Sequence, residues 1–340
     1  MKRNNVCYCF DKNFINQGMI AIKSLIYNNK DVPIDIYILE LGLDENDIQR
    51  IKEMQADNKK IYIIDVEKEK KAIESVDAGD WNISTLVRLL MEELLPNDVD
   101  KVLYIDSDTI VQGNIERVFG TDIDNCLGAA VLDKFINEKE KNRIGINVKS
   151  RYFNAGVMFV NLVKWRELKI GRKCIEILQK NPTINTMPDQ NALNILLENQ
   201  VKLLPLSCNV DGYTTLLEYD LIRKIIPKEN ICFIDREEYE EARKNPIIVH
   251  FIGWYMDKPW IEGNLQPMES QYDFYAEMLG IKYEKVARKK CEGFLSGNIR
   301  EKIRKKIKKA IQKENMRRVT RVYCRGELFL KIGSKIKGGL

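Results

Sequence analysis

Two carboxylates follow an apolar run in the middle of the chain. Residues 102–111 read Val-Leu-Tyr-Ile-Asp-Ser-Asp-Thr-Ile-Val, which places Asp106 and Asp108 at the end of a strand-like segment. Residues i and i+2 of an extended segment point to the same side, so both carboxylates would face one place. Without a counter-charge they would repel each other and lose hydration, and a hard divalent cation such as Mn²⁺ or Mg²⁺ removes both problems. The pattern therefore predicts a metal site of the kind that an enzyme acting on a diphosphate needs.

The single histidine of the chain follows a similar apolar run. His250 comes directly after Pro-Ile-Ile-Val. Two carboxylates and one imidazole, each at the end of a strand, would form a suitable set of metal ligands. Two simpler interpretations stay open: the aspartates could cap a turn or helix after the strand, and the histidine could be an ordinary core residue.

A rival chemistry fits the same acids. The run Asp106-Ser-Asp108-Thr109 also resembles the haloacid dehalogenase phosphohydrolases, in which the first aspartate attacks phosphorus and the second works as acid and base. That class usually opens the chain with this strand and needs a downstream paired-acid motif. Here the strand lies far from the N-terminus, and no apolar strand is followed by Gly-Asp or Asp-Asp.

The elements that must position these residues alternate along the chain. The hydrophobic spacing predicts strands and helices at short intervals, which favours an α/β fold with a mostly parallel central sheet covered by helices on both faces. In such sheets ligands bind beyond the carboxyl ends of the strands, where Asp11 and Asp106 would lie. The expected strands are 6–10, 34–39, 61–66, 101–105, 127–132 and 157–162, with short strands at 201–204 and 231–234, and the expected helices are 15–28, 44–58, 85–95, 171–179 and 190–198.

The composition divides the chain into an acidic body and a basic tail. There are 19 Lys/Arg against 4 Asp/Glu between Lys285 and Lys337, whereas residues 1–284 hold 36 basic and 46 acidic side chains. We therefore expect a core domain over residues 1–283 and a basic helical extension over residues 284–340.

The tail has the pattern of an amphipathic helix. Isoleucines recur every four residues among lysines and arginines, at Ile299, Ile303, Ile307 and Ile311. Such a helix suits the surface of an anionic membrane, and no nucleic acid is expected as a partner because few aromatic residues interleave with the charges. The alternative is a helix that docks on the acidic body of the same chain.

The remaining composition predicts a cytoplasmic protein that is peripheral on the inner face of the membrane. The eight cysteines are scattered without a Cys-x-x-Cys pair, and they are interpreted as reduced thiols. The sequence begins Met-Lys-Arg-Asn-Asn without an apolar signal segment, and no apolar run is long enough to span a bilayer.

Several motifs occur in the order found in glycosyltransferase family 8, which the sequence resembles over roughly residues 5–280. That family includes bacterial lipopolysaccharide galactosyl- and glucosyltransferases and glycogenin. The spacing between His250 and Lys258 is longer than in the family's usual pattern. The matching segments are Val6-Cys-Tyr-Cys-Phe-Asp11-Lys-Asn13, Ser84-Thr-Leu-Val-Arg88, Asp106-Ser-Asp108, Tyr152-Phe-Asn154-Ala155-Gly156, Pro188-Asp189-Gln190-Asn191, and His250-Phe-Ile-Gly253 with Lys258-Pro259-Trp260.

The resemblance implies a fold, a donor and a set of roles. The fold would be GT-A, the donor a UDP-sugar, the cofactor Mn²⁺ or Mg²⁺, and the transfer would retain the anomeric configuration. Three residues would hold the metal, namely Asp106, Asp108 and His250. Substrate would be bound by Asp11 and Asn13 at the nucleoside, by Gly253 and Lys258 at the diphosphate, and by Arg88, Asp133, Asn154, Ala155, Asp189 and Gln190 around the sugar.

The catalytic step has two possible forms in this interpretation. Gln190 and Asp189 are the candidate catalytic residues; a glycosyl-enzyme could form on a nearby side chain such as Asp189, or the acceptor could attack from the front face of the sugar. We favour front-face attack because no acid is clearly placed as a nucleophile. The expected function is transfer of glucose or galactose to a glycan or lipid-linked saccharide. The alternatives are self-glucosylation as in glycogenin, the phosphohydrolase above, and a non-catalytic sugar-nucleotide-binding module.

Overall fold

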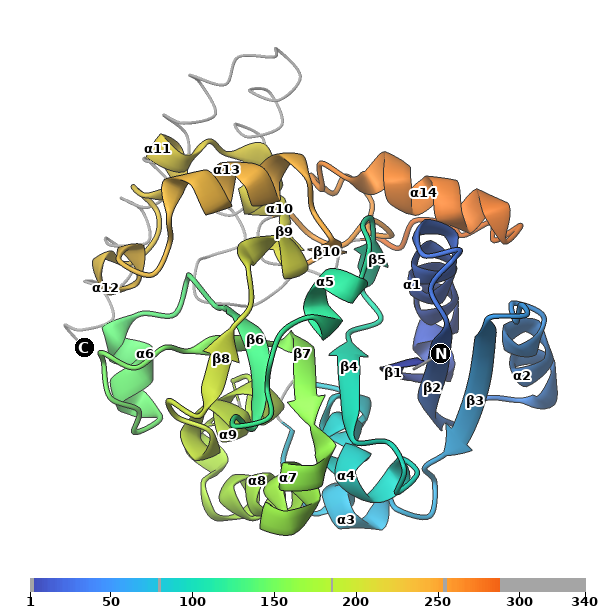
Figure 1. The fold of residues 1–340 in the computed structure, drawn as a ribbon, viewed down its shortest axis with the longest axis horizontal. Coiled ribbons are helices and arrows are strands. Elements are labelled where there is room, and N and C mark those ends of the chain that lie inside the picture. The colour runs from blue at the N-terminus through green and yellow to red at the C-terminus, as the bar shows by residue number, and fades with distance from the viewer. Residues whose placement is uncertain (1–2, 79–80, 185, 253–255, 288–340) are drawn as a thin grey trace.

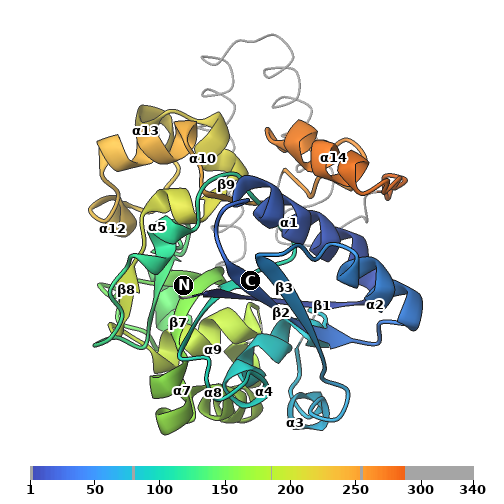
Figure 2. The same ribbon diagram turned by 45° about the vertical axis from the view of Figure 1, so that its right-hand side comes forward.

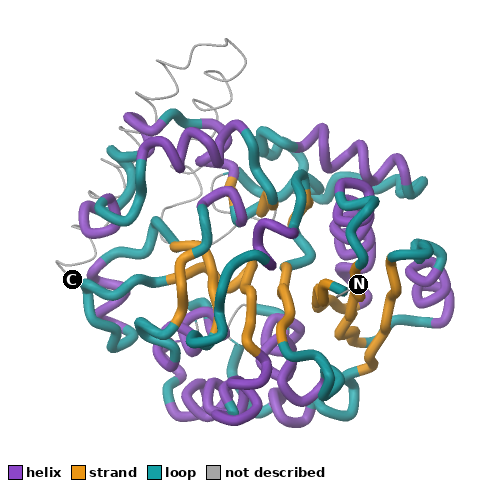
Figure 3. Tube along the Cα trace, in the orientation of Figure 1, coloured by secondary structure: helices purple, strands orange, loops and turns teal. Residues whose placement is uncertain are grey.

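The computed structural model describes residues 3–78, 81–184, 186–252 and 256–287 (Figure 1). A seven-stranded sheet forms its centre, with the strand order β3-β2-β1-β4-β7-β6-β8. Figure 3 shows these strands between layers of helices. The strands are β1 Asn4–Asp11, β2 Ile34–Leu41, β3 Lys59–Asp65, β4 Lys101–Ile105, β6 Gly128–Leu132, β7 Phe153–Asn161 and β8 Val201–Leu203.

All neighbouring pairs in this sheet are parallel except those made by β7, which runs antiparallel to both β4 and β6. The prediction of a mostly parallel sheet is confirmed. The reversal of β7 matters for the site, because it places the first residues of β7 beside the carboxyl end of β4. Val157 pairs with Ile105, and the amide of Asp106 donates to the carbonyl of Gly156 at 2.8 Å.

Helices cover both faces of the sheet because the strand side chains alternate between two apolar layers. In β1, Tyr8 and Phe10 belong to one buried cluster and Cys7 and Cys9 to the other. The helix α1 lies on the first face and α8 on the second, on opposite sides of the sheet in Figures 1 and 2. The longer helices are α1 Ile15–Asn28, α2 Glu45–Lys52, α7 Leu162–Leu168, α8 Ile170–Lys180, α9 Pro188–Leu196, α13 Arg236–Lys244 and α14 Glu269–Met278.

A second, three-stranded sheet lies beside the first and was only partly predicted. It consists of β5 Thr109–Val111, β10 Ile248–His250 and β9 Val210–Asp211, in the order β5-β10-β9. Its strands have two or three residues each, too few for a periodic signal. The antiparallel pair of β5 and β10 sets His250 opposite Thr109, one residue beyond Asp108.

Three expected elements differ from the structure. Residues 231–234 are not a strand, because α12 Lys228–Ile231 ends there and Asp235 caps the next helix by accepting from two backbone amides. The helix expected over 44–58 ends at Lys52, since the chain turns back through the bridge between Ala56 and Lys59. The segment expected as one helix over 85–95 is a 3₁₀ helix, η2 Ile83–Leu90, followed by α4 Met91–Leu94.

The last described residues pack against earlier parts of the chain. Val286 forms a bridge with Ile261, and the ring of Tyr283 packs edge-on against Tyr272. The basic helix expected in the C-terminal extension lies outside the described residues. Within the described part of the chain, every helix is too short or too polar to cross a bilayer.

Candidate active site

The two aspartates and the histidine meet at the carboxyl edge of the main sheet. Asp106 and Asp108 occupy the turn between β4 and β5, and His250 ends β10. Each can offer one ligand atom, and these atoms lie within 4.8 Å of one another. The Nε2 atom of His250 is 3.1 Å from Asp108 Oδ1 and 3.8 Å from Asp106 Oδ2. The backbone amide of Phe251 donates to the carbonyl of Asp108, which fixes the two segments side by side.

Each carboxylate has one oxygen already partnered and one that faces the histidine. Asp106 Oδ1 accepts from Tyr104 Oη at 2.7 Å and lies 2.7 Å from an Arg88 nitrogen. Asp108 Oδ2 is paired with Lys258. Burial by itself would raise the pKa of Asp108, but the charge of Lys258 and the nearby ring of His250 outweigh it and hold that pKa well below its usual range. Asp108 is therefore charged at neutral pH in this arrangement.

This donor set fits a divalent cation. Two carboxylate oxygens and one ring nitrogen converge at a partly buried position, and hard oxygen ligands together with imidazole suit Mn²⁺ or Mg²⁺. When His250 Nε2 is unprotonated, three acceptor atoms face one another, which is unfavourable unless a cation lies between them.

Gly156 leaves the space that this cluster needs. A Cβ atom at this position would lie 2.4 Å from His250 Cε1 and 2.7 Å from Asp106 Oδ2. Any larger residue would push the histidine or the aspartate aside, so glycine is required here by close approach.

A second polar cluster adjoins the first through Arg88. Its Nε lies 3.0 Å from Asp189 Oδ2, and its Nη1 donates to the carbonyl of Ala155 at 2.9 Å. Gln190 Nε2 donates to Asp133 Oδ2 at 3.1 Å, while its Oε1 accepts from the amide of Ala155 at 3.0 Å.

Burial tends to lower the pKa of Arg88, but the nearby carboxylates raise it well above its ordinary value. Burial raises the pKa of Asp189 and of Asp133.

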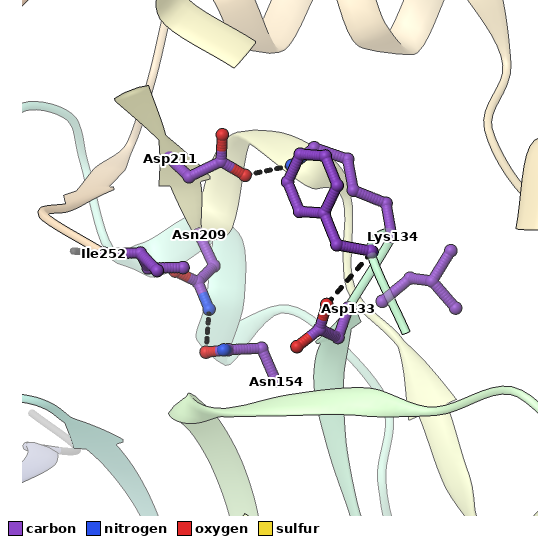
Figure 4. Close-up of a pocket in the computed structure, with 8 residues that line it drawn as sticks. Asp133, Lys134, Asn154, Asn209, Asp211 and Ile252 are labelled. Carbon is purple, nitrogen blue, oxygen red and sulfur yellow. Dashed lines mark hydrogen bonds and ion pairs between the residues drawn. The ribbon is translucent and has the colours of Figure 1, made fainter. Parts of the chain in front are cut away.

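A pocket lies beside these groups and contains a buried ion pair that was not predicted. Figure 4 shows Asp133 and Asn154 on the lower side of the pocket and the ion pair of Lys134 and Asp211 on its upper side. Both members of the pair are almost completely buried. The pocket is lined by Leu132, Asp133, Lys134, Phe135, Asn154, Asn209, Asp211 and Ile252.

The remaining predicted site residues lie in different settings. Asp11 ends β1, where its carboxylate caps η1 Lys12–Phe14 and accepts from Asn82 Nδ2 at 2.5 Å. Asn13 is exposed on that short helix. Lys258 forms an ion pair with Asp108, one of the three candidate metal ligands. Gly253 lies outside the described residues.

Several residues of the site were missed by sequence reasoning. Tyr104 lies two residues before Asp106 on the same strand, so the i and i+2 rule could have found it. Asn209, Lys134 and Asp211 carried no comparable signal, because they come from short segments that only the tertiary structure brings to the pocket.

Comparison with known proteins places this geometry among glycosyltransferases. Residues 5–263 match the family model described as Glycosyl transferase family 8. The chain is 25% identical to a lipopolysaccharide 1,2-glucosyltransferase of Escherichia coli K12, covering 80% of this chain and 77% of that protein. It is 26% identical to a lipopolysaccharide 1,3-galactosyltransferase of Salmonella typhimurium, covering 80% and 77% respectively.

Solved structures show the same fold. The galactosyltransferase LgtC, solved with donor and acceptor sugar analogues, aligns with a TM-score of 0.69 at 23% identity, covering 81% of this chain and 95% of LgtC. The glycosyltransferase GlyE of Streptococcus pneumoniae TIGR4 aligns with a TM-score of 0.57 at 23% identity, covering 85% and 66%. The GT-A fold expected from the sequence is confirmed.

Proposed function

The chain belongs to glycosyl transferase family 8 and is therefore a glycosyltransferase, and we propose that it moves a hexose from a UDP-sugar to a saccharide acceptor. The observation that carries this proposal is the convergence of Asp106, Asp108 and His250 beside a pocket of sugar-compatible acceptors. We favour glucose or galactose as the transferred sugar, because relatives named as glucosyl- and galactosyltransferases match most of the chain. The phosphohydrolase interpretation is not favoured, because the family match spans both acids and the histidine.

In this proposal Asp106, Asp108 and His250 hold Mn²⁺ or Mg²⁺. When bound, the cation stabilises the negative charge that grows on the leaving diphosphate. Lys258 already lies against Asp108 and is placed to add a second positive charge toward the same group. We assign the rest of UDP binding to Asp11 and Asn13 at the nucleoside, and to the Gly253 backbone with Lys258 at the diphosphate.

The second cluster is proposed to hold the sugar. Asp133 and Asp189 present carboxylates that can accept bonds from sugar hydroxyls, and a site with fixed acceptors rejects epimers that leave them unpaired. Arg88 keeps Asp189 in place and ties it to the metal cluster through Asp106. Asn154, at the start of β7, lines the pocket, and we assign it and the neighbouring Ala155 to the side that the sugar approaches.

We favour front-face attack as the catalytic step. The acceptor hydroxyl oxygen bonds to C1 of the sugar on the side from which UDP leaves, the bond from C1 to the UDP oxygen breaks, and that oxygen takes the hydroxyl proton. Configuration is thereby retained. Gln190 is a poor nucleophile here, since its oxygen accepts from Ala155 and its nitrogen donates to Asp133. Asp189 is engaged by Arg88, so the role of both residues is to position the sugar.

Turnover tests the proposed function directly. The purified chain is incubated with UDP-glucose or UDP-galactose and Mn²⁺, and UDP release is followed with and without EDTA. We expect metal-dependent UDP release that Asp106→Asn abolishes and that Asp57→Asn, at an exposed turn, leaves unchanged. Phosphate release from sugar phosphates would instead support a phosphohydrolase, and binding without turnover a non-catalytic module. A gain in the protein's own mass would indicate self-glucosylation.

The acceptor is proposed to be a glycan or lipid-linked saccharide at an anionic membrane, with the chain cytoplasmic and peripheral on the inner face. Two relatives are named for lipopolysaccharide transfer, and the tail combines regularly spaced isoleucines with many cations. Deleting residues 288–340 should abolish cosedimentation with anionic lipid vesicles. If the tail instead docks on the body, the deletion will lower the melting temperature and leave vesicle binding unchanged.

A further inference from the structure

We propose that Asn209 is a positioning residue that holds His250 in the tautomer and orientation required to bind the cation. This inference rests on the metal site of the proposed function and adds a residue to it. Asn209 is 6% exposed and lies between the short helix η4 Leu206–Cys208 and β9. Because β9 pairs in parallel with β10, with Asp211 opposite His250, the backbone keeps Asn209 beside the histidine.

Two side-chain contacts define the position of Asn209. Its Oδ1 atom is 3.1 Å from His250 Nδ1, and its Nδ2 donates to Asn154 Oδ1 at 2.8 Å. Asn154 Oδ1 also accepts from the backbone amide of Gly156 at 3.0 Å. The three side chains therefore form one continuous path from a backbone amide to the imidazole ring, and Figure 4 shows its middle link between Asn209 and Asn154.

The direction of every bond in this path follows from its first donor. A backbone N–H can only donate, so the atom of Asn154 that faces Gly156 is its oxygen. Asn209 must then turn its NH₂ toward that oxygen, which turns its own oxygen toward the ring of His250. The ring nitrogen facing Asn209 is Nδ1, and it must carry a proton in order to donate.

The proton on Nδ1 determines what the second ring nitrogen, Nε2, can bind. With the proton on Nδ1, the Nε2 atom of a neutral His250 keeps its lone pair directed at Asp106 and Asp108, as a metal ligand requires. Without an acceptor at position 209 the preferred tautomer would reverse, because a proton on Nε2 could donate to Asp108 at 3.1 Å. That tautomer cannot bind a metal through Nε2.

An isosteric set of variants tests the acceptor role in the full chain. Mn²⁺ binding is measured by calorimetry for wild type, Asn209→Leu and Asn209→Asp. Leucine has the same shape and no hydrogen bonds, and we expect it to weaken Mn²⁺ binding by about 10- to 100-fold, the usual effect of losing such a partner. Aspartate keeps an acceptor for Nδ1–H but loses the donor to Asn154 Oδ1, so it should bind Mn²⁺ more tightly than Asn209→Leu.

A matched control separates this role from general stability. Asn161 is similarly buried, and its side chain donates to the carbonyls of Ile123 and Cys126 and accepts from the amide of Lys164. Asn161→Leu should lower the melting temperature and leave Mn²⁺ affinity unchanged. If Asn209→Leu behaves in the same way, Asn209 is merely structural and the inference is wrong.

The tautomer can be read without any metal, because His250 is the only histidine of the chain. ¹⁵N-histidine NMR is recorded on metal-free protein at alkaline pH, at which one ring nitrogen of a neutral imidazole carries the proton. We expect the proton on Nδ1 in wild type and a shift toward Nε2 in Asn209→Leu. A wild-type proton on Nε2, or equal Mn²⁺ binding by all three proteins, overturns the inference. A wild type that binds no Mn²⁺ would instead show that the proposed metal site itself is wrong.

Discussion

The substitution Gly156→Ala should disable the metal site with little change elsewhere. The added Cβ would lie 2.4 Å from His250 Cε1 and 2.7 Å from Asp106 Oδ2, whereas ordinary contacts begin near 3.4 Å. The ring or the strand must therefore move by about 1 Å, and a displacement of about 1 Å in a preorganised site can reduce turnover by about 100-fold. We expect Mn²⁺ affinity and UDP release to fall together.

Controls for this prediction come from other glycines. Gly120→Ala would meet its nearest neighbour at 3.5 Å and should be tolerated, whereas Gly128→Ala would meet the carbonyl of Phe159 at 2.8 Å within the sheet. We expect Gly128→Ala to lower the melting temperature and to leave Mn²⁺ affinity unchanged. The reasoning is refuted if Gly156→Ala binds Mn²⁺ as tightly as wild type while its fold is intact by circular dichroism.

Three further predictions concern catalysis and stability. Gln190→Ala should slow transfer by up to about 100-fold without abolishing it, because it loosens the sugar pocket. A covalent sugar adduct on a side chain of the site that the acceptor then removes, found by mass spectrometry, would rule out front-face attack. Lys134→Met should reduce the free energy of unfolding in urea by about 3–5 kcal/mol, because it leaves Asp211 charged and buried, and adding Asp211→Asn should restore part of the loss. Burial raises the pKa of Glu92 above its ordinary value, so its contribution to stability is present below pH 4.5 and is lost as the pH rises through the folded-state pKa. Glu92→Gln should flatten the pH dependence of unfolding in that range, and an unchanged slope would refute this assignment.

The main sheet could be predicted from sequence because its strands carry long apolar runs. The strand that precedes Asp106 and the segment that ends at His250 were both recognised from such runs. The antiparallel direction of β7 was not predicted, since a fully buried strand has the same hydrophobic pattern in either direction. Because β7 runs antiparallel to β4, Gly156 lies beside Asp106 and His250.

The proposed metal ligands could be identified from residue type and spacing, but the contacts that support them could not. Tyr104 and Arg88 each contact the oxygen of Asp106 that faces away from His250. Asn209 contacts Nδ1 of His250, the ring nitrogen that faces away from the two aspartates. These contacts depend on register between distant segments, and strands as short as β9 and β10 leave almost no pattern in the sequence. The cap formed by Asp11 was likewise hidden, because a carboxylate at a strand end fits both a ligand site and a helix start.

Anomalous diffraction from a crystal soaked with Mn²⁺ and UDP tests the central claim most directly. The claim is that Asp106, Asp108 and His250 hold one cation jointly while it contacts the diphosphate. We predict a single manganese peak between these three side chains, with the phosphates of UDP on its open side. A manganese peak elsewhere, or bound UDP with no manganese between the three residues, would contradict it.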